Sequence, residues 1–322
     1  MQPRVLTFGE ALVNFVPANR GPLADQETFH LGVAGAELNT AIGLARLDIP
    51  AAFAGAVGED ALGDKVIKTL RREAVAVDWL ERTPLAPTPL FIKERAGLPL
   101  KTYVYYYREA SPMARGHWRA DALAEAVAAH RFDWVHTTGI TWAVGEKSAQ
   151  TARGVLRDAQ NGGIPCSFDI NVRLKMRPVE QWREIVVEVM AGVQWLFFGD
   201  EEARLLFAED EPSKLERLLR EQGFRGQGVV VKYGERGAQA SVSGAIASVP
   251  AHPAPVTDTV GAGDGFNAGW IAGVLRGYDL TECLRLGALI GAYAVTVPGD
   301  FDGYPTWDRA ARDMSGESDR AR

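Results

Sequence analysis

The segment from Asp258 to Phe266 reads Asp-Thr-Val-Gly-Ala-Gly-Asp-Gly-Phe and contains the residue types in this chain that are best suited to chemistry. Gly261 and Gly263 let the backbone approach a ligand closely, and the apolar run after them predicts a helix whose first N–H groups are free to bind an anion. Asp264 falls in the first turn, where the positive end of the helix should favour its ionised form. Beside a bound phosphate, its carboxylate could orient a substrate hydroxyl and accept the proton during phosphoryl transfer. We therefore expect Gly261, Ala262, Gly263 and Asp264 to act together in catalysis.

A structural role is the alternative for this segment. Asp264 would then cap the helix, and Gly265, Gly269 and Gly273 would allow close helix packing. A dinucleotide-binding fingerprint is disfavoured, because Phe266 stands where the third glycine is needed and the segment lies late in the chain. The chain has no Gly-Lys-Ser/Thr sequence, which excludes a Walker-type phosphate loop.

The elements that must position this segment alternate between short β-rich runs and longer amphipathic patterns. The predicted buried strands are Arg4–Phe8, Ala52–Val57, Trp134–Thr137, Pro165–Asp169, Trp195–Phe198 and Gly228–Lys232. The predicted helices are Ala36–Arg46, Leu62–Glu73, Asp121–His130, Ser148–Asn161, Val179–Met190, Ser213–Glu221 and Leu280–Val295. Such alternation predicts an α/β fold, a doubly wound and mostly parallel sheet sandwiched by helices.

Two regions, residues 12–31 and 85–108, carry strand-like sequence interrupted by prolines and no helical pattern. Because these strands do not fit the parallel sheet, we expect a small separate β-sheet that acts as a lid over one edge of the site. A hairpin without function is the alternative. Both regions would be inserted in one domain of residues 1–314, followed by a mobile tail at 315–322.

Composition narrows the function classes. The chain has 322 residues, of which 47% are hydrophobic and 24% are charged, as in ordinary globular proteins. A net charge of -6 gives no long-range attraction for nucleic acid or anionic lipid, so we expect neither as a partner. Neither a secretory segment nor an apolar run of about 20 residues is apparent, which favours a cytoplasmic location. Cys166 and Cys283 are expected to be buried free thiols.

Two motifs resemble the signatures of the ribokinase-like (PfkB) carbohydrate kinases. Asp258–Phe266 is similar to their C-terminal signature, and Gly35–Ala41 with Gly55–Gly63 is similar to their N-terminal one. The similarity extends over nearly the whole chain. It implies an α/β sandwich with a β-sheet lid, ATP and Mg²⁺ as cofactors, and transfer of the γ-phosphate to a sugar hydroxymethyl group. A requirement for a monovalent cation stays open, and a homo-oligomer is expected because an exposed lid edge could pair with a second subunit.

Within that family, four segments are most similar to the 2-keto-3-deoxygluconate kinases: Tyr106–Arg108, His136–Thr141, Asp169–Arg173 and Gly299–Asp300. In a strand, Tyr106 and Arg108 fall on one face, so a phenol and a guanidinium could converge on one ligand. Arginine can grip a carboxylate at two points, and a sugar acid offers one. The expected reaction is phosphorylation of 2-keto-3-deoxygluconate at the 6-hydroxyl. For Arg108 the alternative is a solvated lid charge, and tyrosines 103, 105 and 107 are expected to pack within the lid.

The resemblance assigns further site residues. Substrate contacts are expected from Gly35, Asn39, Phe91, Arg173 and Asp300, and nucleotide contacts from Asn171, Arg173, Lys232, Gly234 and Gly237 next to Gly261 and Gly263. Structural alternatives stay open for three of these sites. Asn39 could serve only the helix start, residues 232–237 could form an ordinary hairpin turn, and Asp300 could be a surface turn acid.

The sequence departs from the family pattern at two points. Gly199-Asp200-Glu201-Glu202 replaces an Asn-x-x-Glu motif tied to Mg²⁺, so only Glu202 can be matched as a metal-site residue. Phe91 stands where the keto-deoxy sugar acid kinases often have a lid tyrosine, which removes one hydroxyl from the pocket. A fructokinase or another neutral-sugar kinase is the alternative function, and a non-catalytic nucleotide or sugar sensor is a further one.

Overall fold

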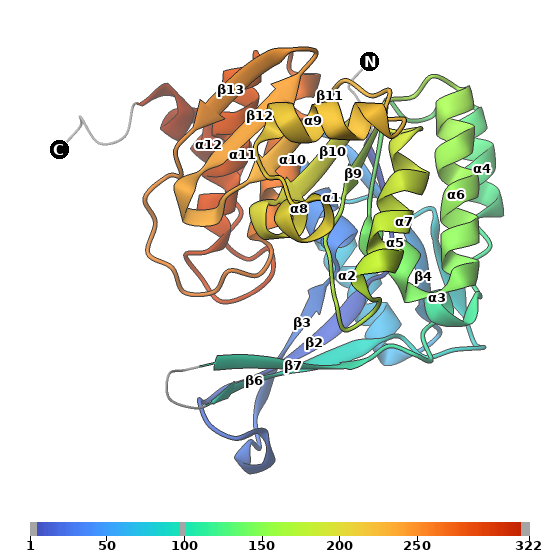
Figure 1. Ribbon diagram of the computed structural model, residues 1–322. Helices are drawn as coiled ribbons and strands as arrows, with labels where there is room; N and C mark the ends of the chain where they lie inside the picture. The colour runs from blue at the N-terminus through green and yellow to red at the C-terminus, as the bar shows by residue number, and fades with distance from the viewer. Residues whose placement is uncertain (1–4, 97–100, 317–322) are drawn as a thin grey trace.

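The computed structural model describes residues 5–96 and 101–316, and in them nine strands form one central sheet (Figure 1). The strand order is β13-β12-β11-β10-β9-β8-β1-β4-β5. Seven neighbouring strands pair in parallel, namely β5, β4, β1, β8, β9, β10 and β11. Strands β12 and β13 are antiparallel to their neighbours. The bounds are β1 Val5–Phe8, β4 Ala51–Gly58, β5 Leu80–Thr83, β8 Trp134–Thr138, β9 Cys166–Asp169, β10 Trp195–Gly199, β11 Gly228–Lys232, β12 Ala238–Val242 and β13 Ala245–Val249. The predicted mostly parallel α/β fold is confirmed.

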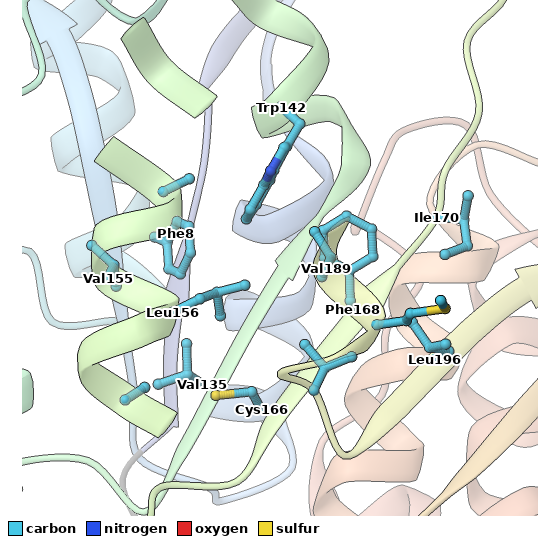
Figure 2. Close-up of a cluster of buried hydrophobic side chains, with 14 of the residues drawn as sticks. Phe8, Val135, Trp142, Val155, Leu156, Cys166, Phe168, Ile170, Val189 and Leu196 are labelled. Carbon is cyan, nitrogen blue, oxygen red and sulfur yellow. The ribbon is translucent and has the colours of Figure 1, made fainter. Parts of the chain in front are cut away.

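Helices cover both faces of this sheet. One layer consists of α1 Ala36–Arg46, α2 Ala61–Arg72, α10 Ala262–Leu275, α11 Leu280–Ala294 and α12 Trp307–Ser315. The other consists of α3 Pro112–Arg115, α4 Asp121–Ala128, α5 Gly139–Val144, α6 Glu146–Asn161, α7 Val179–Met190, α8 Asp200–Phe207 and α9 Pro212–Glu221. Neighbouring strand residues alternate between the two cores: Val5 packs in one and Leu6 in the other. Figure 2 shows the second core, where Phe8, Val135 and Phe168 from three strands meet side chains of the helices.

Element boundaries differ from the predictions by one or two residues. The helix predicted to end at His130 ends at Ala128, because His130 has a left-handed backbone with φ of 50°. The helix predicted from Ser148 begins at Glu146, directly after Gly145. The edge strands β5 and β13 and the strand β12 next to β13 were not predicted, since they are short and carry no continuous apolar run.

The predicted lid is a separate four-stranded sheet with the order β3-β2-β6-β7, which projects from one side of the α/β body (Figure 1). Its strands are β2 Leu12–Pro17, β3 Phe29–Ala34, β6 Leu90–Ala96 and β7 Lys101–Tyr107. Strand β3 extends three residues beyond the predicted segment. Tyrosines 103, 105 and 107, which were expected to pack within the lid, are exposed, and the Tyr105 hydroxyl donates to Glu94 of the neighbouring strand β6 at 2.7 Å.

The remaining fold predictions concern the chain end and the cysteines. In the predicted tail, Ser315 is the last residue of α12 and Gly316 caps that helix, and residues 317–322 lie outside the described residues. Cys166 and Cys283 are buried free thiols, as expected. Within the described residues, no helix has the length and apolar character needed to cross a membrane.

Candidate active site

Gly261 forms the cap before α10, and the Ala262 N–H that follows it lies 3.4 Å from the Thr259 carbonyl oxygen. The Gly261 φ of 78° lies in the left-handed region that favours glycine, and a Cβ there would stand 1.7 Å from the Asp300 carbonyl oxygen. The Tyr304 hydroxyl donates to the Gly261 carbonyl at 2.6 Å and fixes this turn. The N–H groups of the first helical turn have no carbonyl four residues earlier within the helix. Residues 261–263, which we call the nest, therefore have the form of an anion site.

Asp264 lies in the first turn of α10 and is only 8% exposed. Burial raises the pKa of its carboxyl to about 7, although the Asn39 side-chain amide, which donates to Oδ2 at 2.8 Å, lowers it. The net direction of this pKa is therefore upward, opposite to the effect expected from the helix start, because the loss of solvation on burial is the largest cause. A carboxyl that titrates near neutral pH is well matched to accepting a proton.

A second buried carboxylate, Asp169, lies at the end of β9 and faces the same cavity. The Lys232 ammonium lies 2.7 Å from Asp169 Oδ2, and the Asn267 amide donates to the same oxygen at 2.6 Å. Asp169 Oδ1 is buried and has no hydrogen-bond partner among the described residues. Neither Asp169 nor Asn267 was predicted as a site residue from the sequence. A polar residue at the carboxyl end of a buried parallel strand was the available signal for Asp169.

Glu202, the candidate metal residue, lies in the first turn of α8. Its carboxylate accepts the backbone N–H groups of Val172 and Gly199, each at 2.8 Å. Burial raises its pKa, and the charge of Asp169 raises it further. No group of three metal-ligating side chains occurs in the described part of the chain. One or two carboxylates suffice for Mg²⁺ when phosphate oxygens and water complete its shell, so the free oxygen of Asp169 with Glu202 fits this ion.

The lid contributes Tyr106 and Arg108 to the cavity, with the Arg108 guanidinium 5.6 Å from the Tyr106 ring centre. Phe91 packs against Tyr106 with ring centres 5.4 Å apart. Arg108 Nη2 lies 2.5 Å from the Oε2 of buried Glu10, and the Ser111 hydroxyl donates to Glu10 Oε1 at 2.6 Å. Arg108 Nε is buried and lacks a hydrogen-bond partner among the described residues. Nη2 also lacks a hydrogen-bond partner despite its ion pair with Glu10, and Nη1 lies 3.4 Å from Met176 Sδ. The guanidinium is thus held by its neighbours while two of its nitrogens make no hydrogen bond.

Asp300 is buried, so the alternative of a surface turn acid does not hold. Two lid side chains reach it: the Asn14 amide donates to Oδ1 at 3.3 Å, and the Lys93 ammonium lies 3.3 Å from the same atom. Asn14, Lys93 and Glu10 were missed in the sequence analysis. Alternation along β6 was the available signal for Lys93, because it shares the face of Phe91.

Two cavities meet at the nest. The first, of about 500 Å³, contains most of the predicted site residues: Gly35, Asn39, Phe91, Tyr106, Arg108, Asn171, Arg173, Glu202, Lys232, Gly261, Gly263, Asp264 and Asp300. The second, of about 720 Å³, contains Gly234, Gly237 and Ala262 and is mainly apolar. Lys232, Thr259 and Gly263 line both cavities. Asn171, expected as a nucleotide contact, lines the first cavity together with Arg173, Lys232, Gly261 and Gly263. Residues 232–237 connect β11 to β12, and Lys232, Gly234 and Gly237 also line the second cavity.

A family model described as pfkB family carbohydrate kinase matches residues 2–307. The chain belongs to this family. Its fold and the resemblance of its two motifs agree with this membership, so the protein is a carbohydrate kinase of the ribokinase-like type.

Individual kinases of the family give further detail. A 2-dehydro-3-deoxygluconokinase of Bacillus subtilis is 33% identical over 98% of this chain and 97% of its own length. A fructokinase of Klebsiella pneumoniae is 27% identical over 98% of this chain and all of its own length. Among solved structures, a PfkB protein from Polaromonas sp. JS666 superposes with a TM-score of 0.84, at 31% identity, over 96% of this chain and 99% of the other. This kinase is therefore similar to enzymes named for two kinds of sugar.

Proposed function

We propose that this kinase transfers the γ-phosphoryl group of ATP to the 6-hydroxyl of 2-keto-3-deoxygluconate, which is also called 2-dehydro-3-deoxygluconate. The mainly apolar cavity beside Gly234 and Gly237 suits an adenosine group, and the polar cavity under the lid suits a sugar acid. Because Gly263 and Lys232 line both cavities, the two substrates would meet at the nest. The nest and Asp264 are then the groups nearest to the transferred phosphoryl.

The chemistry assigned to the chain follows from this placement. The hydroxyl oxygen of the sugar forms a bond to the γ-phosphorus as the bond from that phosphorus to the oxygen bridging to the β-phosphorus breaks, and ADP leaves with that oxygen. Asp264 accepts the hydroxyl proton, and Asn39 holds its carboxylate in place. The nest amides donate hydrogen bonds to the phosphoryl oxygens as charge develops on them. Mg²⁺, held by Asp169 and Glu202 together with the phosphates, would supply further positive charge.

The proposed preference for a sugar acid over a neutral sugar rests on Arg108. Its Nε and Nη2 are buried donors without a hydrogen-bond partner among the described residues, and the residue lines a cavity that Tyr106 also lines. A buried donor without a partner is costly, so a ligand that accepts its hydrogen bond is favoured. A carboxylate is such a ligand, and it would bind a guanidinium more strongly than a neutral oxygen does. The name of the Bacillus subtilis relative supports the same assignment.

A neutral-sugar kinase is the second candidate, because Glu10 already neutralises Arg108 at 2.5 Å. In that case Arg108 would only brace the lid, and the acid group would have no special partner. The name of the Klebsiella pneumoniae relative supports this reading.

An ADP-release assay with Arg108 variants separates the two. The panel contains 2-keto-3-deoxygluconate, its C4 epimer, fructose and ribose, and the variants are Arg108→Ala and Arg108→Lys, which keeps a cation for Glu10. Loss of a charge-assisted hydrogen bond, about 1.5–3 kcal/mol, should lower kcat/KM for the keto acids about 10- to 150-fold and leave the neutral sugars within about threefold. Arg20→Ala, an exposed lid arginine outside both cavities, is the matched control.

Two outcomes would overturn the sugar-acid proposal. One is faster turnover of fructose or ribose than of either keto acid by the unaltered enzyme. The other is an unchanged kcat/KM for the keto acids in both Arg108 variants. Melting curves of every variant show whether the fold is retained, since Arg108→Ala leaves Glu10 without its cation.

A further inference from the structure

Lys93 belongs to the lid, yet its ammonium lies in the active site. The residue is only 2% exposed, and lysine is rarely buried unless it is paired. Its Nζ lies 3.3 Å from Asp300 Oδ1 and 3.5 Å from Asp258 Oδ2. Neither acid belongs to the lid. A single cation thus joins the lid to two separate segments of the α/β body.

These two acids lie on either side of the nest. Asp258 starts the loop that leads to Gly261, and its Oδ1 accepts the backbone N–H of Val260 at 3.2 Å. The Asp300 carbonyl oxygen lies so close to Gly261 that a Cβ added to this glycine would stand only 1.7 Å from it. Whatever holds Asp258 and Asp300 together therefore also fixes the turn at Gly261.

The negative charges around Asp300 favour a buried ammonium at the position of Lys93. Burial raises the pKa of Asp300 and the Lys93 ammonium lowers it, while the nearby charges of Asp258 and Asp302 raise it. Several carboxylates next to a phosphate site repel each other and repel the phosphate. A buried ammonium between them offsets this repulsion where the local dielectric constant is low.

We propose that Lys93 is a positioning residue through which lid closure completes the phosphate site: its ammonium, brought in by β6, holds Asp258 and Asp300 together and so keeps the nest in its anion-binding geometry. The side chain acts on the nest through the two acids and needs no contact with the transferred phosphoryl. This inference rests on the carbohydrate kinase activity and on the nest as the phosphate site. It does not depend on which sugar is phosphorylated.

Hydrogen–deuterium exchange of the full chain tests the inference without any sugar. The protein variants are Lys93→Met, Lys93→Arg and Asp258→Asn, each measured alone and with ADP and Mg²⁺. In Lys93→Met, peptides that cover residues 258–266 should exchange about tenfold faster than in the unaltered enzyme. Lys93→Arg keeps the charge and should stay within about threefold. Asp258→Asn should give an intermediate value, because Asp300 still pairs with Lys93.

The matched control lies at the next position of the same strand. Glu94 accepts the Tyr105 hydroxyl at 2.7 Å and the Leu23 N–H at 3.1 Å, both within the lid. Glu94→Gln should therefore speed exchange in the lid and leave residues 258–266 unchanged. Equal exchange of residues 258–266 in Lys93→Met, Asp258→Asn and the unaltered enzyme would overturn the inference. Should Lys93→Met fail to fold, Asp258→Asn carries the same test.

Kinetics with ATP and 2-keto-3-deoxygluconate give the second readout. Lys93→Met should lower kcat about 10- to 100-fold while the sugar KM changes less than threefold, and Lys93→Arg should restore most of kcat. A rise in sugar KM with kcat retained would make Lys93 a substrate contact and would overturn its positioning role. If the unaltered enzyme does not turn over this keto acid, the substrate proposal fails, and the exchange experiment still decides the role of Lys93.

Discussion

Replacing Asn39 with alanine should raise the pKa of Asp264 and move the acidic limb of the pH–rate profile to higher pH. The Asn39 amide donates to Asp264 Oδ2 at 2.8 Å inside a buried site, and this bond favours the ionised carboxylate. Burial alone pushes the pKa upward. Without the amide, burial acts unopposed by this hydrogen bond, and a larger part of the enzyme holds Asp264 protonated at neutral pH.

The size of the effect follows from the hydrogen bond. A hydrogen bond to a charged group contributes about 1.5–3 kcal/mol, and one pH unit corresponds to about 1.4 kcal/mol. The pKa of Asp264, about 7 in the unaltered enzyme, should therefore rise by about 1–2 units in Asn39→Ala. Since the ionised carboxylate accepts the proton, activity is lost as the pH falls through this pKa. At pH 7, where about half of the unaltered enzyme holds Asp264 ionised, the variant should lose about 5- to 50-fold in kcat/KM beyond any effect on sugar binding.

The assay is the pH dependence of kcat/KM from pH 5.5 to 9.5, because this quantity reports ionisation in the free enzyme. Thr40→Val is the matched control. Its hydroxyl donates to the Asp264 backbone carbonyl at 3.3 Å and not to the carboxylate, so its acidic limb should not move. Loss of a sugar contact from Asn39 would lower kcat/KM equally at every pH. An Asn39→Ala profile that is lower but has its acidic limb at the original pH would refute the reasoning.

Two further variants test the nest and a buried acid. Gly261→Ala places a Cβ against the Asp300 carbonyl and should lower kcat about 100-fold or more. Gly277 has a similar φ of 75° but open space around it, so Gly277→Ala should cost only about 1 kcal/mol of stability. Kinetics and melting curves of the two variants check this, and equal kcat values for them would contradict it. Burial raises the pKa of Glu37 to about 7, so its contribution to folding is full below pH 4.5 and is lost as the pH rises through 7. Glu37→Gln should therefore remove about 2–4 kcal/mol of the decline in unfolding free energy between pH 5 and 8, measured by denaturant titration, and an unchanged decline would contradict this.

The sequence predicts the sheet and the nest because both depend on local patterns. Buried parallel strands are continuous apolar runs, as in Val229–Val231, and two glycines before an apolar helix are enough to place an anion site. The antiparallel strands β12 and β13 could not be predicted in this way, because small residues such as those of Ala238–Val242 pair through their backbone and carry little periodic signal.

The partners of the site residues could not be predicted, because they come from segments far apart in the chain. Nothing local indicates that Lys93 reaches Asp300, or that Glu10 meets Arg108. The direction of the Asp264 pKa depends on the depth of burial, which a sequence motif does not contain. Residue types and spacing thus predict candidate reacting groups, and the structure supplies the contacts that set their charge and position.

A crystal structure of the enzyme with Mg²⁺, a non-hydrolysable ATP analogue and 2-keto-3-deoxygluconate tests the central claim most directly. We expect the γ-phosphorus within hydrogen-bonding reach of the nest amides, and the 6-hydroxyl oxygen within about 3 Å of an Asp264 oxygen. A γ-phosphate bound away from residues 261–263, or a sugar whose hydroxyl groups all lie beyond the reach of Asp264, would contradict it.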